Sequence, residues 1–237
     1  MGPCDIGVIL TFHREGLLAQ STLRSAWEAK ARAEARGLRV EVTVVADQPD
    51  PATAAVLGGW RAQGHTLRLI ESEAGDVGHN RNAAIAATPA RFIATLDGDD
   101  LWCPDWLTAA ATRAMEGARR VIWHPEANLY FGQRGAEHWF MHPDMDAPGF
   151  DVADLVLVNP WTALCLAPRE IFLDVPYPPS NVKAGFGFED WHWNRATVAR
   201  GVVHKTVPGT VHFIRQKPVS LMRSTAATGG LMVPLSP

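Results

Sequence analysis

Residues 91–104 read RFIATLDGDDLWCP, and this stretch shows most clearly how strand, loop and helix follow one another in the chain. Residues 91–96 form a short apolar run typical of a buried β-strand, and the run stops at the acidic cluster Asp97-Gly98-Asp99-Asp100. A helix is predicted over 104–117, because a proline suits the first turn and strong helix formers follow it. The stretch is therefore a strand–loop–helix unit with carboxylates at the carboxyl end of the strand.

The residues before this stretch repeat the alternation of strand and helix. Strands are predicted over 6–12, 40–44 and 66–70, and helices over 17–36, 52–63 and 80–87. Such alternation implies right-handed crossovers and a mostly parallel, Rossmann-type sheet flanked by helices, which is the α/β class. Ligands of these folds lie outside the carboxyl ends of the strands, so we expect function there. After about residue 120 the pattern becomes irregular, with a helix predicted over 189–199 and strands near 202–206 and 211–215.

Composition places the 237-residue chain among folded proteins and excludes several classes of function. Hydrophobic residues make up 47% and charged residues 20%, which argues against disorder. The net charge of -3 supplies no basic surface, so we expect no nucleic-acid partner. The most apolar stretch, 152–167, is interrupted by polar residues and proline and is shorter than the roughly 20 residues that span a bilayer.

The beginning of the chain and its cysteines bear on the compartment. The sequence MGPCDIGVIL lacks the basic region and apolar run of a secretory signal, so no integral membrane segment and a cytoplasmic location are expected. The three cysteines are an odd number without CxxC spacing, which favours free thiols in a reducing compartment.

The acidic cluster 97–100 favours a divalent metal ion. Three carboxylates within four residues repel one another unless a cation, a proton or basic neighbours offset their charge. Carboxylate oxygens suit Mg²⁺ or Mn²⁺, which commonly take one or two such ligands and fill the remaining positions with water and substrate phosphates. The alternative is capping of the following helix, for which Asp100 alone would be enough.

Four motifs in chain order resemble the pattern of family 2 glycosyltransferases. They are VILTFHRE at 8–15, GHNRNA at 78–83, FIATLDGDDLW at 92–102 and FEDW at 188–191. The resemblance implies a GT-A fold and an inverting transfer of sugar from a nucleotide diphosphate sugar, of UDP or GDP type, to a carbohydrate or other hydroxyl acceptor.

The resemblance also implies one GT-A domain over the whole chain, residues 1–237. Within it, residues 1–118 would form the nucleotide-sugar-binding half and residues 119–237 the acceptor-binding half.

Donor-binding roles follow from matching this sequence to the family pattern. Thr11, His13 and Asp47 would line the base and ribose pocket, Arg81 would approach the base or the diphosphate, Asp97 would face the ribose, and Asp99 would ligate Mn²⁺ or Mg²⁺ on the diphosphate. A metal and an arginine there would lower the barrier, because the leaving diphosphate gains charge in the transition state. The residues alone leave Arg81 open as a surface helix residue.

The family pattern assigns the acceptor side to the FEDW motif. Asp190 would be the general base for the acceptor hydroxyl, and Glu189 and Trp191 would bind the acceptor. Two carboxylates at a helix start can instead simply complement the helix dipole. Trp191 and Trp193 point to different sides of a helix, so one of them is expected in the core. His212 would be a second metal ligand, or an ordinary buried histidine with a hydrogen-bond partner.

Three other functions compete with this interpretation. A non-catalytic module would keep the nucleotide-sugar crevice without the chemistry. A metal-dependent phosphotransferase would use Asp97 as nucleophile, but that fold normally opens with its Asp-x-Asp motif, which here follows the fourth predicted strand. A sugar nucleotidyltransferase needs a Gly-rich, basic turn that residues 11–17 lack.

Overall fold

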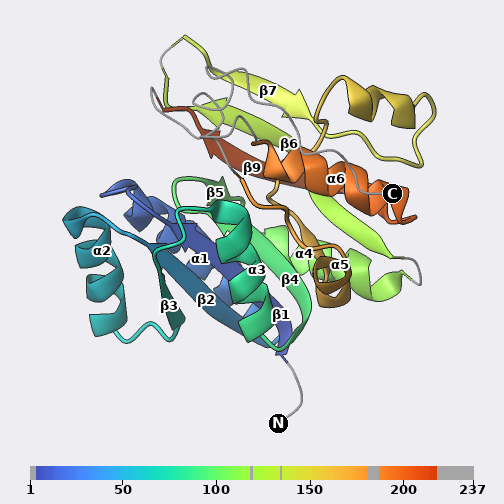
Figure 1. Cartoon of the computed structure of the whole chain (residues 1–237). Helices are drawn as coiled ribbons and strands as arrows, with labels where there is room; N and C mark the ends of the chain where they lie inside the picture. Colours follow the sequence, from blue (N-terminus) through green and yellow to red (C-terminus); the bar gives the residue numbers. More distant parts are fainter. Residues whose placement is uncertain (1–3, 118–119, 134, 181–186, 218–237) are drawn as a thin grey trace.

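The computed structural model describes residues 4–117, 120–133, 135–180 and 187–217. Its strands form one sheet in the order β3-β2-β1-β4-β8-β6-β9-β5, with β7 paired to β6 (Figure 1). The strands are β1 Cys4–Phe12, β2 Val40–Asp47, β3 Arg68–Ser72, β4 Ala90–Asp97, β5 Leu101–Trp102, β6 Val121–Phe131, β7 His138–Met141, β8 Leu166–Pro168 and β9 Val203–Arg215. The helices are α1 Leu18–Ala35, α2 Pro51–Ala62, α3 Val77–Ala87, α4 Trp106–Glu116, α5 Arg169–Asp174 and α6 Glu189–Ala199, with a 3-10 helix η1 at Val152–Val156.

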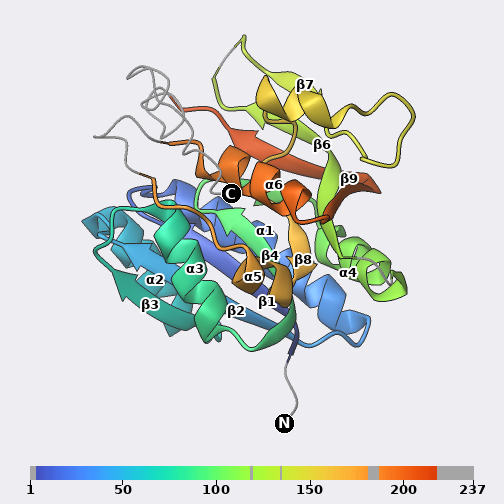
Figure 2. The same cartoon turned by 45° about the vertical axis from the view of Figure 1, so that its right-hand side comes forward.

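The first four strands are parallel, as the alternating pattern predicts. β1 lies between β2 and β4, and β3 pairs with the outer side of β2. Side chains alternate across this sheet: Val8 and Leu10 join the cluster with α1, α2 and α4, whereas Ile9 joins the cluster with α3, α5 and α6. Figure 2 shows α3 and α5 side by side on one face, where they contact each other. The α/β class is therefore confirmed.

The second half extends the same sheet with antiparallel strands. β8 pairs antiparallel with both β4 and β6, and β9 then runs parallel to β6 for almost its full length. The two short strands predicted near 202–206 and 211–215 are one strand, because Gly209, at φ 76°, lets β9 pass through an irregularity in its register with β6. The sheet is thus continuous through the part of the chain that the structure describes.

The segment after the acidic cluster differs from the sequence prediction. α4 begins at Trp106 instead of 104, because residues 101–102 form β5 and pair with β9. Asp100 as a helix cap is wrong: its Oδ1 accepts a hydrogen bond from the backbone N–H of Arg215 at 2.7 Å. The carboxylate therefore fastens the end of β9 to the acidic loop.

The core of the second half contains neutral histidines packed on tryptophan. His204 stacks on Trp161 with ring centroids 4.1 Å apart, and its Nδ1 lies 2.9 Å from His124 Nε2. Burial lowers the pKa of His204 to about 3, so the ring is uncharged at neutral pH.

The three cysteines are free, as expected. Among the described helices, none combines the length and the apolar composition needed to cross a bilayer.

Gly98 is required by the packing of β1 against the acidic loop. A Cβ at this position would lie 2.7 Å from the backbone oxygen of Thr11 and 2.6 Å from a ring carbon of Phe12. The carbonyl of Gly98 also accepts a hydrogen bond from Thr22 Oγ1 at 3.0 Å, which fixes the loop on α1. The absence of a side chain thus holds the acidic cluster close to the end of β1.

We expect Gly98→Ala to lower the free energy of unfolding by about 1–3 kcal/mol, because backbone must move to admit the methyl group. Gly58→Ala is the matched control, since a Cβ there meets nothing within 4 Å inside α2. It should raise stability by about 0.5–1 kcal/mol. Urea unfolding midpoints of the two variants check the pair, and an equal effect of both would contradict the close approach at Gly98.

Candidate active site

The carboxyl ends of β1, β2 and β4 bring four of the predicted donor-site residues together. Thr11 is paired in register with Asp97, and its Oγ1 donates to Asp97 Oδ1 at 3.2 Å. His13 follows β1, and its Nδ1 lies 2.5 Å from the backbone oxygen of Asp47 at the end of β2. Parallel strands end at one edge, so residues far apart in sequence meet there.

Asp47 organises the loop that leads into α3. Its two carboxylate oxygens accept from the backbone N–H of Gly75 at 3.1 Å and from Asn80 Nδ2 at 2.8 Å. Asn80 in turn accepts from Ser72 Oγ at 2.6 Å, so β2, β3 and α3 are joined at this point. Asp47 is 6% exposed and both of its oxygens are engaged by these donors, so its contact with a ligand stays a prediction.

Arg81 joins the donor side to the acceptor side. The residue is 2% exposed, which overturns its alternative assignment to the surface of a helix. Its Nη2 donates to Asp97 Oδ1 at 2.6 Å and its Nη1 to Glu189 Oε1 at 3.0 Å. The guanidinium also lies over the ring of Tyr177, 5.3 Å from its centroid. Burial opposes the charge, but Asp97 and Glu189 outweigh it and raise the pKa of Arg81.

The acidic cluster concentrates negative charge in a largely buried loop. Asp99 Oδ2 lies 2.7 Å from Lys217 Nζ, at the end of the described chain. Burial raises the pKa of the Asp99 carboxyl, and the Lys217 ion pair opposes this rise without cancelling it. Burial and the charges of Asp99 and Asp97 raise the pKa of Asp100 well above its usual range. Among the described residues, the cations beside Asp99 therefore do not offset the effect of burial on its carboxyl group.

The donor chemistry of this cluster fits a hard divalent cation. Carboxylate oxygens are suitable ligands, and Mg²⁺ commonly takes only one or two of them beside phosphate and water. Among the described residues, no three His, Cys, Asp or Glu side chains are placed to hold a metal by themselves. A cation here would therefore rely on Asp99 and on oxygens brought by a substrate.

His212 lies in an aromatic core. It is fully buried, its ring meets Trp106 edge-on at 4.5 Å between centroids, and it is paired in register with Trp102. Burial lowers its pKa well below the usual range. The role of His212 as a metal ligand stays a prediction.

The acidic pair at the start of α6 splits into two environments. Phe188, just before the helix, has φ 57°, a left-handed conformation that is costly for a bulky residue. Glu189 is buried and accepts from Arg81 and from Ser180 Oγ at 3.3 Å. Asp190 is half-buried, and its two oxygens accept from the backbone N–H of Trp191 at 2.7 Å and from Asn159 Nδ2 at 3.1 Å.

These environments set the protonation of Asp190. Burial and the neighbouring charge of Glu189 raise the pKa of Asp190 to about 7, although Arg81 favours the ionised form. A carboxyl group with a pKa near neutrality is well matched to take a proton from a hydroxyl at physiological pH.

One of the two tryptophans in α6 is in the core, as predicted. Trp193 is fully buried, with stacked contacts to Phe172 at 5.0 Å and Tyr177 at 4.8 Å between ring centroids. Trp191 is partly exposed and its Nε1 donates to the backbone oxygen of Leu155 at 2.8 Å. Trp191 therefore fastens η1 to α6, and its contact with an acceptor stays a prediction.

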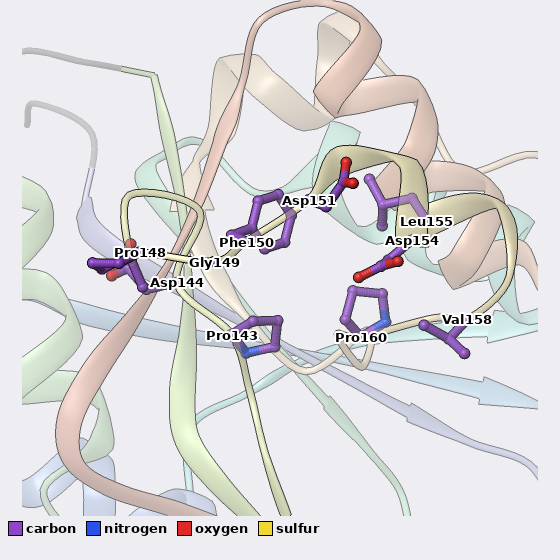
Figure 3. Close-up of a pocket in the computed structure, with 11 residues that line it drawn as sticks. Pro143, Asp144, Pro148, Gly149, Phe150, Asp151, Asp154, Leu155, Val158 and Pro160 are labelled. Atoms are coloured by element: carbon purple, nitrogen blue, oxygen red, sulfur yellow. The ribbon is translucent and has the colours of Figure 1, made fainter.

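A cavity of about 270 Å³ is lined by residues from the segment 143–160, which contains η1 (Figure 3). Apolar and acidic side chains form its wall together. The lining residues are Pro143, Asp144, Ala147, Pro148, Gly149, Phe150, Asp151, Asp154, Leu155, Val158 and Pro160. Because Leu155 also accepts from Trp191, the cavity wall is tied directly to the helix that carries Asp190.

Three residues that contact the predicted site carboxylates were not predicted from the sequence: Asn80, Lys217 and Asn159. Asn80 was within the quoted GHNRNA motif, so its position next to Arg81 was the available signal. Lys217 and Asn159 lie outside the regular elements, and no pattern in the sequence pointed to their contacts with Asp99 and Asp190.

Comparison with known proteins agrees with the geometry. A family model described as Glycosyl transferase family 2 matches residues 7–145, which is more than half of the chain. The chain belongs to this family. This is the family that the motifs at 8–15, 78–83 and 92–102 predict, whereas the motif at 188–191 lies outside the matched residues. No curated protein sequence matches the chain.

Solved structures share the fold at low sequence identity. S. aureus TarS 1–349 in complex with UDP-GlcNAc superposes with a TM-score of 0.68 at 15% identity, over 93% of this chain and 61% of that one. The mannosyltransferase PcManGT from Pyrobaculum calidifontis, in complex with GDP-Man and Mn²⁺, gives 0.63 at 19% identity, over 89% of this chain and 56% of that one. The chain thus spans about three fifths of these two structures and 39% of the longer TarS structure, and the likeness confirms the predicted GT-A fold.

We expect Arg81→Met to lower the free energy of unfolding by about 3 kcal/mol, because Glu189 would be left buried without its cation. Breaking a buried ion pair commonly costs about 3–5 kcal/mol of stability. We expect the lower value here, because the Asp97 side chain keeps 33% of its surface exposed. Arg32→Met is the control: Arg32 pairs with Glu28 and Asp105 on the surface, and its loss should not be measurable. Urea unfolding of both variants tests this, and equal stabilities would contradict the bridging role of Arg81.

Proposed function

We propose that the chain is a metal-dependent, inverting glycosyltransferase that moves a sugar from a UDP- or GDP-type nucleotide diphosphate sugar to a hydroxyl acceptor. The observation that carries this proposal is the bridge Asp97–Arg81–Glu189, which brings the end of β4 next to the start of α6. The bridge therefore brings the predicted donor side close to α6, the helix that carries the predicted base Asp190. The bound UDP-GlcNAc of TarS and GDP-Man of PcManGT support this class of donor.

The donor would lie along the carboxyl ends of β1, β2 and β4. Thr11, His13 and Asp47 would surround the base and ribose, and Asp97 would face the ribose. Asp99 would hold Mn²⁺ or Mg²⁺, which supplies positive charge for the leaving nucleotide diphosphate. The Mn²⁺ of PcManGT supports this choice of cation. Arg81 is already paired with two carboxylates, so we assign it to positioning Asp97 and Glu189 instead of to direct contact with the diphosphate.

Asp190 would act as the general base. The acceptor hydroxyl gives its proton to the carboxylate while its oxygen forms a bond to the anomeric carbon. The bond from that carbon to the diphosphate oxygen breaks on the opposite side, and the electron pair leaves with the diphosphate. A single in-line displacement of this kind inverts the anomeric configuration.

The competing functions are less well supported. Asp97 Oδ1 accepts from both Thr11 and Arg81, an arrangement that suits a positioned binding group better than a nucleophile. A module without catalysis would not need a carboxyl group whose pKa is raised to about 7 beside the donor side. The division into halves at residue 118, the acceptor-binding role of Glu189 and the cytoplasmic location remain expectations from the sequence.

We expect Asp190→Asn to lower turnover by about 10²–10⁴-fold with donor affinity unchanged, because a general base acts on the acceptor proton. In the parent, turnover should rise as pH increases through about 7, since only the ionised carboxyl accepts the proton. The variant should lose this dependence. Rates with a panel of sugar acceptors, and the product anomer by NMR, provide the measurement.

Asp174→Asn is the control for this experiment, because Asp174 is paired with Arg120 and Arg200 at the surface. It should keep parental turnover. Full turnover of Asp190→Asn, or retention of configuration in the product, would remove Asp190 from the mechanism.

We expect Asp99→Asn to weaken Mn²⁺-dependent binding of UDP or GDP at least tenfold while leaving metal-free nucleotide binding and the fold unchanged, because it removes the anionic ligand. Titration calorimetry with and without Mn²⁺ measures both affinities. Asp105→Asn, in the same segment but exposed and paired with Arg32, should bind as the parent does. The metal assignment fails if the two variants behave alike.

A further inference from the structure

Asn159 links the segment after η1 to the proposed base. Its Nδ2 donates to Asp190 Oδ2 at 3.1 Å, and its Oδ1 accepts from Asn194 Nδ2 at 2.9 Å. Asn194 is fully buried one turn further along α6, and the same Nδ2 donates to the backbone oxygen of Trp161 at 2.9 Å. The three side chains form a row of hydrogen bonds that ends on the carboxylate.

The direction of this row is fixed by its buried end. The Trp161 carbonyl can only accept, so the amide of Asn194 must present its NH₂ group to it. The same NH₂ group meets Asn159, which must therefore turn its own oxygen toward Asn194 and its NH₂ group toward Asp190. The reverse arrangement would set oxygen against oxygen in a buried site, with no donor between them.

We propose that Asn159 is a positioning residue for the general base, which holds Asp190 Oδ2 in place and favours the ionised carboxylate. The inference rests on the proposed function, in which Asp190 receives the acceptor proton. A donor to the ionised form stabilises it, and Asn159 supplies this donor without adding charge. Each carboxylate oxygen keeps room for a second hydrogen bond, so the acceptor hydroxyl still has access.

The charged and titratable neighbours of Asp190 make such a donor useful. Glu189 and Asp97 oppose its ionisation, whereas Arg81 and the backbone N–H of Trp191 favour it. Tyr177 and Tyr130 also lie within electrostatic range of Asp190. Arg81 is shared between two other carboxylates, and the donors that the described residues give directly to Asp190 are the neutral N–H groups of Asn159 and Trp191.

The position of Asn159 also ties the base to the segment that lines the cavity. Val158 and Pro160, its neighbours in sequence, line the cavity of Figure 3, while its own amide reaches Asp190. The hydrogen bond from Trp191 to Leu155 fastens the other end of the same segment to α6. The segment is thus held to α6 at two points, Leu155 and Asn159.

Two variants test the proposal through the pKa of Asp190, read from its carboxyl carbon by ¹³C NMR. The signal is assigned by its loss in Asp190→Asn, so no acceptor is needed. Asn159→Leu should raise this pKa by about one to two pH units, because a hydrogen bond to the charged form is lost. Asn159→Asp keeps the shape and the bond from Asn194, and should raise it further, because two carboxyl groups would share the site.

Asn82→Ala is the matched control, because Asn82 bridges to the backbone of Tyr177 on both its amide atoms without touching Asp190. A purely structural role for Asn159 would lower the thermal midpoint of its variants, as for Asn82→Ala, with no change in the pKa of Asp190. That result overturns the inference. If Asn159→Leu does not fold, Asn159→Ala takes its place, because it removes the same donor without adding a charge.

An activity readout separates this inference from the proposed function. The acid limb of turnover should move to higher pH by the same amount as the NMR pKa, with the KM for the donor unchanged. Full turnover of Asp190→Asn would refute the proposed base while leaving the NMR coupling intact. If Asp190→Asn is inactive and the Asn159 variants leave the NMR pKa of Asp190 unchanged, only the role of Asn159 is refuted.

Discussion

The buried guanidinium of Arg81 is the constraint on which the site depends. A cation that is 2% exposed must find anionic partners or lose several kcal/mol, and it finds one at the end of β4 and another at the start of α6. Glu189 is 108 positions away from Arg81 in sequence. The ion pairs therefore require α6 to lie beside the end of β4, so this bridge joins two parts of the chain that are far apart in sequence.

This constraint also explains why two adjacent carboxylates differ. Glu189 accepts from Arg81, whereas the donors that the described residues give to Asp190 are the neutral N–H groups of Trp191 and Asn159. Burial and the charge of Glu189 raise the pKa of Asp190 to about 7. Environment thus separates a structural carboxylate from a titratable one, which is the usual way in which neighbouring acids acquire different roles.

The sequence predicted those parts that depend on local pattern. Apolar runs followed by helix formers located β1 to β4, and α6 was predicted at 189–199, where the structure has it. The parallel-sheet rule then brought Thr11, Asp47 and Asp97 to one edge. β6 escaped prediction, because its sequence contains Pro125 and buried polar residues such as His124 and Asn128, which are acceptable only beside their tertiary partners. Lys217 and Asn159 were missed for the same reason.

Charge balance at the end of β4 gives the physical support for the proposed cation. Among the described residues, carboxylates outnumber the cations that face them. The acidic groups are Glu15, Asp97, Asp99, Asp100, Glu189 and Asp190, and the basic groups are Arg81, Arg215 and Lys217. Arg81 is divided between two carboxylates, and Lys217 does not cancel the rise in the pKa of Asp99. A divalent cation would restore neutrality where a nucleotide diphosphate needs one, so the excess of negative charge is explained by what the site is proposed to bind.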